Sequence, residues 1–457
     1  MNPKPTEGGL LRDVGLTGAI FMGLGSIVGT GLFVSLGIAA GVAGHGILLA
    51  LPLAALLALF NGLSSAQLAA AHPKSGGTYE YGYRFLSPSL GFSAGWMFLL
   101  AKSASAATAA LGVAGALLLF LGVEGGGALV RVGIGAATVA LLTVLVAGGI
   151  RRSNQANLVI VGVTLAIFVL FLAVGLPQAL PVLLDGNPDG LHGGASGATR
   201  SAATDGSGGL DLLGGGFGAL FHATALLFVA YTGYGRIATL GEEVREPRRT
   251  IPLAIWATLG VVAVLYLGVA VVALGSLGAD GFAEATAGTA APLQVVAGEL
   301  GFPLLPTILA VAAVTAMVGV LLNLLLGLSR VALAMGRRRD LPVVLERIHT
   351  PTASPRVAVG AVGAVVLALV LLGDVRTTWS FSAFTVLIYY GITNLAALRL
   401  PADLRLYPRW IPVLGLAGCL LLAFQVEPVY WAMGLGLLGV GLVGRAVAGR
   451  WNARRSS

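Results

Sequence analysis

Charged residues are scarce in this chain of 457 residues, where Asp, Glu, Lys and Arg together make up 10%. An average soluble domain has roughly 25%. Hydrophobic residues make up 57% of the chain, so a folded molecule of this size cannot cover its surface with polar groups. This scarcity excludes a soluble globular protein and indicates that lipid is the solvent.

Residues that build catalytic and metal sites are also few. The single cysteine, Cys419, excludes a disulfide framework within the chain, and the five histidines are scattered. His222 stands alone in an apolar segment, where a structural hydrogen bond is the expected role. The chain contains no HExxH pattern and no GxxxxGK[ST] loop. The sequence therefore favours neither an enzyme nor an ATP-driven pump, and it predicts no cofactor and no metal site.

Long apolar runs are abundant, by contrast. A membrane-spanning helix needs about 20 predominantly apolar residues, and such runs recur along almost the whole chain. The sequence therefore predicts an all-α membrane protein with twelve spanning segments. These segments are 14–40, 44–70, 90–121, 128–149, 154–176, 212–240, 251–276, 303–334, 355–373, 379–399, 408–424 and 428–446.

The net charge of +8 is better explained by topology than by nucleic-acid binding. With the N-terminus inside, 22 of the 27 Lys and Arg residues fall in the inner loops and tails, and the outer loops hold only Arg131, Arg200 and Arg376. The positive-inside rule then predicts that both tails, 1–13 and 447–457, are cytoplasmic. Residues 177–211, rich in Gly, Ser, Asp and Pro, are expected to form an extracellular loop. The first apolar segment lacks a cleavage pattern and is expected to be retained as a helix.

Two apolar segments contain clusters of glycine near their middle. The first reads GLGSIVGTGLF (23–33), and the second reads FVAYTGYGRIATLGEE (228–243). Unwound backbone at membrane depth is tolerated only where it lines a cavity or is buried in protein. Paired interruptions at matching places in two halves point to a transporter site, where free N–H groups can hold a carboxylate and free carbonyls an ammonium group. The alternative is that these glycines only allow close helix packing.

Three motifs resemble the amino acid–polyamine–organocation superfamily, nearest to its bacterial and cationic amino acid transporter-like branch. They are GSIVGTGLF (25–33), FVAYTGYGRIATLGEEVREPRRTIPLAI (228–255) and SRVALAMGRRRDLPVVLERIHTPTASPR (329–356). The resemblance implies the LeuT-type fold, with broken helices 1 and 6, an inverted repeat of five plus five helices (14–176 and 212–399) and two further helices (400–446). It also implies an amino acid permease that works by alternating access in the cytoplasmic membrane.

The resemblance assigns site residues as well. In the first helix, the positions expected to line the substrate carboxylate are Ile27, Thr30 and Gly31, with Ser26 beside them. In the sixth helix, the positions expected near the substrate are Phe228, Val229, Tyr231, Thr232 and Gly233, with Tyr234 as a gating aromatic residue. Core packing is the alternative for both tyrosines. Glu242 and Glu243 resemble inner-gate carboxylates, and a solvated helix end is their alternative.

The chain departs from the family in its charged positions. Thr164 occupies the place of the fifth-helix lysine of proton-coupled relatives, so that coupling scheme cannot be copied. Lys102 instead lies about twelve residues into the third helix, and an ionisable residue at that depth is expensive. It could bind and release a proton, pair with an anionic group of the substrate, or serve a structural role. The small residues that share its face, such as Ser105 and Ala109, are expected to leave room for a cavity.

Arg236 begins the inner half of the sixth helix and adds positive charge beside Lys102. The apolar cores of helices one, three, six and eight hold no acidic residue to offset them. The sequence therefore predicts a neutral or acidic amino acid as substrate, although Arg236 could instead extend toward the inner membrane surface or pair with Glu242 or Glu243. Asn323 could coordinate an ion or water, or make an interhelical hydrogen bond.

The remaining partners follow from this interpretation. Membrane lipids surround the chain, the amino acid is the small-molecule substrate, and a proton is the expected coupling ion, with sodium as the alternative. An amino-acid exchanger, or a transporter of another small solute such as a polyamine or organic acid, shares the same sequence features. The sequence does not specify the oligomeric state.

Overall fold

The computed structural model describes residues 14–72, 76–123, 127–149, 154–184, 211–239, 244–349, 354–372 and 374–456. Within these ranges the regular structure is helical and no strand forms. Two isolated β-bridges are present, and one of them joins Val14 to Val244.

The described part of the first predicted repeat consists of helices joined by short turns. Its first segment is divided, and a short helix that the sequence did not predict lies between the second and third segments. The elements are α1 (Leu16–Ile27), the π-helix η1 (Gly31–Ser35), α2 (Leu36–Ala43), η2 (Gly44–Gly46), α3 (Ile47–Ala71), α4 (Thr78–Phe85), α5 (Pro88–Phe120), α6 (Ala128–Ala147) and α7 (Asn154–Leu184).

The second predicted repeat begins with another divided segment, and the last two apolar segments are also helical. The elements are α8 (Gly216–Tyr231), the 3₁₀ turn η3 (Thr232–Tyr234), α9 (Gly235–Thr239), α10 (Pro247–Thr289), α11 (Pro292–Glu299), α12 (Leu305–Arg337), η4 (Val343–Glu346), α13 (Arg356–Val370), α14 (Val375–Leu398), η5 (Ala402–Leu404), α15 (Trp410–Ala423) and α16 (Pro428–Ser456).

Three helices run past the ends that hydropathy indicates. α16 continues to Ser456, beyond the end expected at residue 446. α7 continues through Pro177 and Pro181 to Leu184, so the loop expected from residue 177 begins later. α10 continues to Thr289 but bends at Gly278, whose φ of 68° is a conformation that glycine adopts without penalty. Proline and glycine are tolerated inside membrane helices because neighbouring groups satisfy the freed backbone.

Exposed side chains show that this is a multi-pass membrane protein. Nine helical stretches of the described residues are long and apolar enough to cross a membrane, and α13 and α15 are shorter apolar helices. Large apolar side chains lie on the outside of the molecule, among them Leu129 at 87% exposure and Val264 at 73%. Such a surface is stable in hydrocarbon and not in water.

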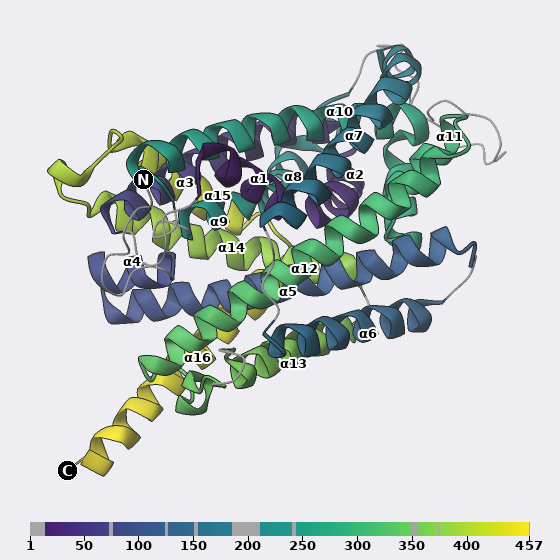
Figure 1. The fold of residues 1–457 in the computed structure, drawn as a ribbon. Coiled ribbons are helices and arrows are strands. Elements are labelled where there is room, and N and C mark those ends of the chain that lie inside the picture. The colour runs from purple at the N-terminus through teal and green to yellow at the C-terminus, as the bar shows by residue number, and fades with distance from the viewer. Residues whose placement is uncertain are drawn as a thin grey trace, which may run out of the picture.

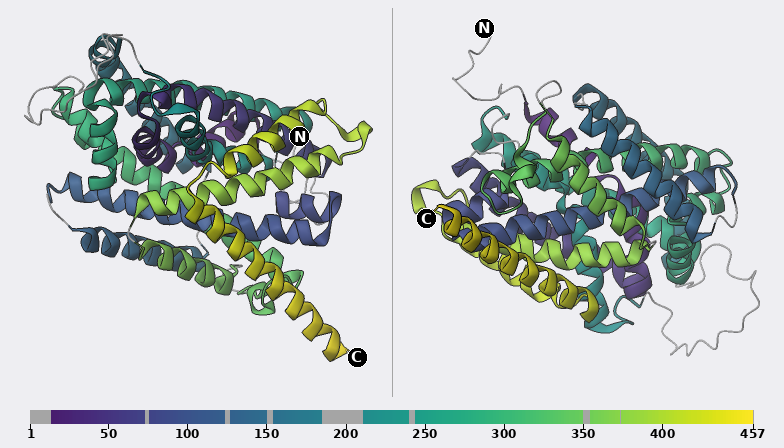
Figure 2. Two further views of the ribbon diagram at one scale, coloured as in Figure 1. Left: turned by 180° about the vertical axis from the view of Figure 1, so that it is seen from behind. Right: turned by 90° about the horizontal axis from the view of Figure 1, so that it is seen from below.

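The divided helices lie in the interior of the bundle. Figure 1 shows α1, α2 and α8 between α10 on one side and α5 and α12 on the other. α6 and α13 pack together at the margin, and α16 runs along the outside (Figure 2). α4 and α11 mark opposite ends of the bundle in Figure 1, and we refer to these as the α4 end and the α11 end.

The best-buried helices, α5 and α14, meet along a seam of hydroxyl groups. Thr108 and Thr378 lie 2.7 Å apart, and Ser105 and Ser382 lie 2.8 Å apart. Ser382 also donates to the carbonyl of Ala101 at 2.9 Å. The face of the third helix that carries Ser105 is therefore packed against α14. The expectation that its small residues leave room for a cavity was wrong, because hydroxyl groups of α14 fill that side.

Candidate functional site

The first helix is interrupted where the sequence predicts. α1 ends at Ile27, and Val28 adopts an extended conformation with φ −74° and ψ 93°. The chain resumes as a π-helix at Gly31. The N–H groups of Gly29 and Thr30 donate no hydrogen bond within the described part of the chain. The break therefore leaves two amide donors available at the centre of the bundle.

The two hydroxyl groups beside this break differ in whether they have a hydrogen-bond partner. The hydroxyl of Thr30 is buried and has no hydrogen-bond partner, whereas the hydroxyl of Ser26 donates to the carbonyl of Met22 in its own helix at 2.8 Å. A buried polar atom without a partner is costly and calls for an explanation. Thr30 thus adds a third free polar group to the break, and Ser26 adds none.

The sixth helix is interrupted in a milder way, because a 3₁₀ turn separates α8 from α9. Side-chain hydroxyl groups donate to three carbonyls at the end of α8, and those of Val229 and Thr232 also accept a backbone N–H. Thr232 Oγ1 donates to the carbonyl of Val229 at 2.7 Å, Tyr266 OH to that of Ala230 at 3.3 Å, and Tyr390 OH to that of Thr232 at 3.2 Å. The break in helix 6 is therefore closed by hydroxyl groups, unlike the break in helix 1.

Glycine allows the two breaks to touch. A Cβ on Gly233 would lie 2.4 Å from the carbonyl oxygen of Ser26, and a Cβ on Gly31 would lie 2.8 Å from the Cβ of Ala230. These distances are shorter than real Cβ contacts, so neither position accepts a side chain without movement. For these two glycines the packing explanation is supported, and it is compatible with a site because close approach is what brings the breaks together.

Lys102 on α5 reaches the break in helix 6. Its Nζ donates to Thr232 Oγ1 at 2.9 Å, and this is its one polar contact within the described residues. The ammonium group carries three N–H donors, so two remain for a ligand or for water. No carboxylate of the described chain pairs with Lys102. It is therefore a charged group in the middle of the bundle with unused hydrogen-bonding capacity.

Aromatic rings surround the same turn. Tyr390 on α14 packs edge-on against Phe228, with ring centroids 5.6 Å apart, and lies 5.5 Å from the ring of Tyr234. Tyr389 adds a further ring 4.5 Å from Tyr390. Phe228 and Tyr234 are fully buried, so the two predicted positions contribute to a closed aromatic wall.

Tyr266 of α10 connects both breaks and was not among the predicted residues. Its hydroxyl lies 3.1 Å from the carbonyl of Ile27 and 3.3 Å from that of Ala230. Its ring lies 5.1 Å from that of Tyr231, whose own hydroxyl is 3.4 Å from the carbonyl of Leu51. Tyr231 is thus turned toward α3 and α10, in the arrangement of a packing residue.

The other predicted residues lie outside this group. Thr164 on α7 is buried, and its hydroxyl donates to the carbonyl of Ile160 at 2.8 Å. Asn323 lies one turn beyond Val320, which packs on Gly29, and its amide makes no hydrogen bond in the described part of the chain. Arg236 stands partly buried at the start of α9. Glu242 and Glu243 lie outside the described residues.

The first and sixth helices are also tied together at the α4 end. The N–H of Arg245, just after the sixth helix, donates to the carbonyl of Val14, just before the first, at 2.9 Å. This contact forms the isolated bridge between Val14 and Val244. The two inner half-helices, α1 and α9, are therefore linked through the chain that flanks them.

Comparison with known proteins identifies the family. The sequence matches the amino acid permease family over residues 18–438. The chain belongs to this family. An uncharacterized transporter of Mycobacterium tuberculosis is 39% identical over 442 residues, which cover 96% of this chain and 92% of the relative.

Two more distant relatives have names that state a substrate. The branched-chain amino acid permease BcaP of Bacillus subtilis is 27% identical, over 87% of this chain and 83% of its own length. The methylthioribose transporter of the same organism is also 27% identical, over 92% of this chain and 90% of its own length. Membership of the amino acid–polyamine–organocation superfamily, expected from three motifs, is thereby confirmed.

Proposed function

We propose that this permease is a secondary active transporter that carries a neutral or acidic amino acid across the cytoplasmic membrane by alternating access. In this proposal the described helices form twelve spans, with the divided α1–α2 and α8–α9 segments as the first spans of two inverted repeats. Both termini face the cytoplasm, which places the α4 end inside. Arginine placement and the matched breaks support this arrangement.

The contrast between the two breaks supports an amino acid as the cargo. The break in helix 1 offers the amides of Gly29 and Thr30 and the unpaired hydroxyl of Thr30, which suit a carboxylate. The break in helix 6 has three of its carbonyls capped by hydroxyl groups. We therefore assign the substrate carboxylate to helix 1 and the rest of the substrate to the wall formed by Phe228 and Tyr234.

In this proposal the charge of Lys102 determines which substrate charge the site accepts. An ammonium group without a carboxylate partner repels a cationic ligand and attracts an anionic one, most strongly where water is excluded. The Nζ of Lys102, 2.9 Å from Thr232, is the observation on which this part of the proposal rests. We expect saturable uptake of a neutral or acidic amino acid and none of arginine.

Lys102 is also our candidate for proton coupling. Burial disfavours the charged form of a lysine, so the group can release a proton when the site is closed and regain it when water enters. Thr164 supplies no titratable group at the position used by proton-coupled relatives. Asn323, with its free amide, is the candidate ligand if an ion such as sodium takes part.

The test is uptake by purified protein in liposomes, with and without an inward proton gradient or sodium. The panel should contain neutral, acidic and basic amino acids, a polyamine, an organic acid and methylthioribose. The native chain is compared with Lys102→Ala and Lys102→Arg. Arginine keeps the positive charge but does not release its proton, so it separates coupling from simple charge pairing.

Each outcome has a distinct meaning. If both substitutions abolish the effect of the gradient, Lys102 is the coupling group. If Lys102→Arg retains gradient-driven uptake, coupling through Lys102 is ruled out and a substrate contact remains. Uptake that ignores the gradient and requires substrate inside identifies an exchanger. Saturable uptake of arginine would refute the proposed substrate class.

A further inference from the structure

A cavity of about 450 Å³ opens at the α4 end, far from the helix breaks in sequence. It lies where the end of α12, the start of α5 and the last part of α16 meet. The lining residues are Ser89, Arg338, Arg339, Asp340, Leu442, Arg445 and Ala446. Three of the seven are arginines and one is acidic, which makes the cavity electropositive.

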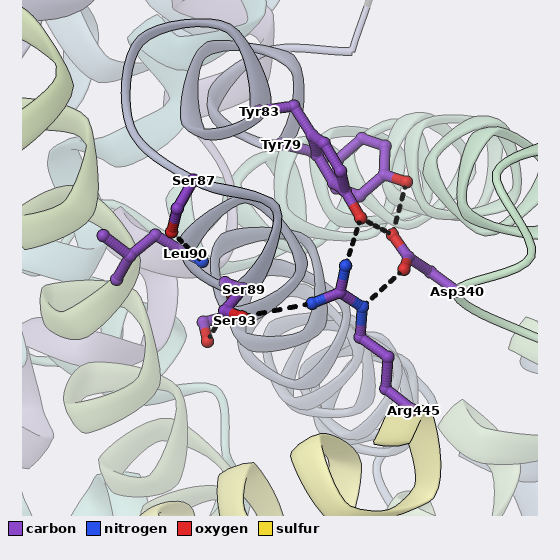
Figure 3. Close-up of polar contacts among 8 residues, drawn as sticks. All are labelled: Tyr79, Tyr83, Ser87, Ser89, Leu90, Ser93, Asp340 and Arg445. Carbon is purple, nitrogen blue, oxygen red and sulfur yellow. Dashed lines mark hydrogen bonds and ion pairs between the residues drawn. The ribbon is translucent and has the colours of Figure 1, made fainter. Parts of the chain in front are cut away.

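Asp340 holds this region together. Its carboxylate accepts hydrogen bonds from Tyr79 OH at 2.8 Å, from Tyr83 OH, and from Arg445 Nε at 2.8 Å (Figure 3). Its side chain is only 5% exposed. Burial, with a further contribution from Asp340, raises the pKa of Tyr83 to about 12, so this phenol remains a donor at physiological pH. The Asp340 carboxylate therefore already has hydrogen-bond partners within the protein, and its negative charge is offset by Arg445.

The arginines retain unused donors. Arg338 pairs with Glu80 at 2.5 Å and lies over the ring of Tyr83, 4.5 Å from its centroid. Arg445 also contacts Tyr83 OH at 3.1 Å and Ser89 Oγ at 3.4 Å (Figure 3). The Arg339 side chain is exposed and makes no hydrogen bond or ion pair with the described residues. After Asp340 and Glu80 are counted, one positive charge remains in excess.

The cavity borders a surface that faces hydrocarbon. On α16, Leu442 and Ala446 line the cavity, while Val440, Val443 and Val447 are 66%, 64% and 58% exposed. Arg445 follows the helix start at Pro428 by 17 residues, a rise of about 26 Å at 1.5 Å per residue. A hydrocarbon core is about 30 Å thick. Arg445 therefore lies near one edge of the apolar layer, where lipid phosphates are found.

We propose that this cavity binds the phosphate group of an anionic phospholipid, whose acyl chains lie in the hydrocarbon layer beside α16. Guanidinium groups recognise phosphate through paired N–H donors. Basic pockets between membrane helices suit anionic headgroups. No residue of the helix breaks lines this cavity, and a bound ligand would connect α16 to the start of α5 and the end of α12.

The test measures binding to detergent-purified, delipidated full-length protein. Phosphatidylglycerol, phosphatidylcholine and inorganic phosphate are added separately, and bound lipid is counted by native mass spectrometry alongside thermal stability. We expect phosphatidylglycerol to bind and stabilise, and the other two to do neither. Arg339→Ala should weaken phosphatidylglycerol binding about fivefold, the effect of about 1 kcal/mol per basic residue near a lipid surface.

Arg337→Ala provides the matched control. Arg337 is exposed at the end of α12 and carries the same charge, but it does not line the cavity. Both arginine side chains lack hydrogen bonds and ion pairs to the described residues, so neither substitution should disturb the fold. Equal weakening by both variants would overturn the proposal in favour of diffuse surface charge. If inorganic phosphate raised the thermal stability as much as phosphatidylglycerol does, the assignment to a lipid would be overturned. If phosphatidylcholine bound as tightly as phosphatidylglycerol, the proposed selectivity for an anionic headgroup would be overturned.

Discussion

The ammonium group of Lys102 and the hydroxyl group of Thr232 lie 2.9 Å apart, which joins the third helix to the turn that interrupts the sixth. Thr232 Oγ1 in turn donates a hydrogen bond to the carbonyl of Val229 at 2.7 Å. The hydroxyl is therefore both an acceptor and a donor, and it orients the lysine relative to the end of α8. Any change in this turn is transmitted directly to the charged group.

Thr232→Val removes this hydroxyl but retains the shape of the side chain. A hydrogen bond to a charged group contributes about 1.5–3 kcal/mol, so we expect the initial uptake rate to fall about tenfold or more, since 1.4 kcal/mol equals a factor of ten. Thr232→Ser keeps the hydroxyl and should retain most of the rate. Liposome uptake of the amino acid that the native chain prefers would check this. Comparable rates for the valine and serine variants would show that the contact with Lys102 does not matter for transport.

Tyr266→Phe should destabilise the protein as well as slow it. The substitution leaves the carbonyls of Ile27 and Ala230 without their donor, and an unsatisfied buried polar group costs about 1–3 kcal/mol. Thermal unfolding in detergent should therefore begin at a lower temperature than for the native chain. Tyr231→Phe is the control, because the Tyr231 hydroxyl makes only a 3.4 Å contact with Leu51. If the two variants unfold at the same temperature, the Tyr266 hydroxyl that joins the breaks contributes no more to stability than the Tyr231 hydroxyl does.

The sequence predicted the breaks better than it predicted what closes them. Glycine clusters mark positions where a helix can be interrupted, and Gly31 and Gly233 indeed meet the opposite break. Tyr266 and Tyr390, in contrast, come from α10 and α14, and each reads in the sequence as another aromatic residue in an apolar run. Their roles depend on helix packing over long sequence separations, which periodicity does not contain.

The third helix illustrates the same limit. Lys102 is recognisable in the sequence because a charge in an apolar run is unusual on its own. The packing beside Ser105 is not, because the hydroxyl of Ser382 that fills this space lies 277 residues away. Apolar runs, by comparison, locate spanning helices well because every backbone group in hydrocarbon must be satisfied within its own helix.

Gly233→Ala tests the contact between the two breaks. The added methyl group would lie 2.4 Å from the carbonyl oxygen of Ser26 and 2.5 Å from Ile27 Cγ1. Because a backbone oxygen cannot easily move aside, we expect the breaks to separate and uptake to be lost. Gly218→Ala in α8 is the matched control, since its methyl group would meet no heavy atom within 4 Å. Gly218→Ala should match the native chain in uptake and melting temperature, and equal loss in both variants would point to a general effect of alanine.

The ionisation of Glu427, at the α11 end, should make the stability of the folded protein depend on pH. Its carboxylate lies 3.3 Å from His222 Nε2 on α8 and 2.9 Å from Arg376 NH2 on α14. The His222 ring beside the carboxylate, helped by Arg376 and opposed by burial, lowers the pKa of Glu427 from 4.5 to about 2. A lowered carboxyl pKa means that the stabilisation is complete above the unfolded value and is lost as pH falls toward the folded one. The contribution should therefore disappear between about pH 4.5 and about pH 2.

Glu427→Gln should accordingly lower the melting temperature at neutral pH and flatten its decline in acid. The measurement is the difference in melting temperature between variant and native chain across that acid range, which cancels the titration of the other carboxylates. Asp403→Asn is the control, because Asp403 is exposed and makes no ion pair with the described residues. Its difference from the native chain should stay constant with pH. A constant difference for Glu427→Gln as well would mean that the link from α8 to α14 through Glu427 does not depend on its charge.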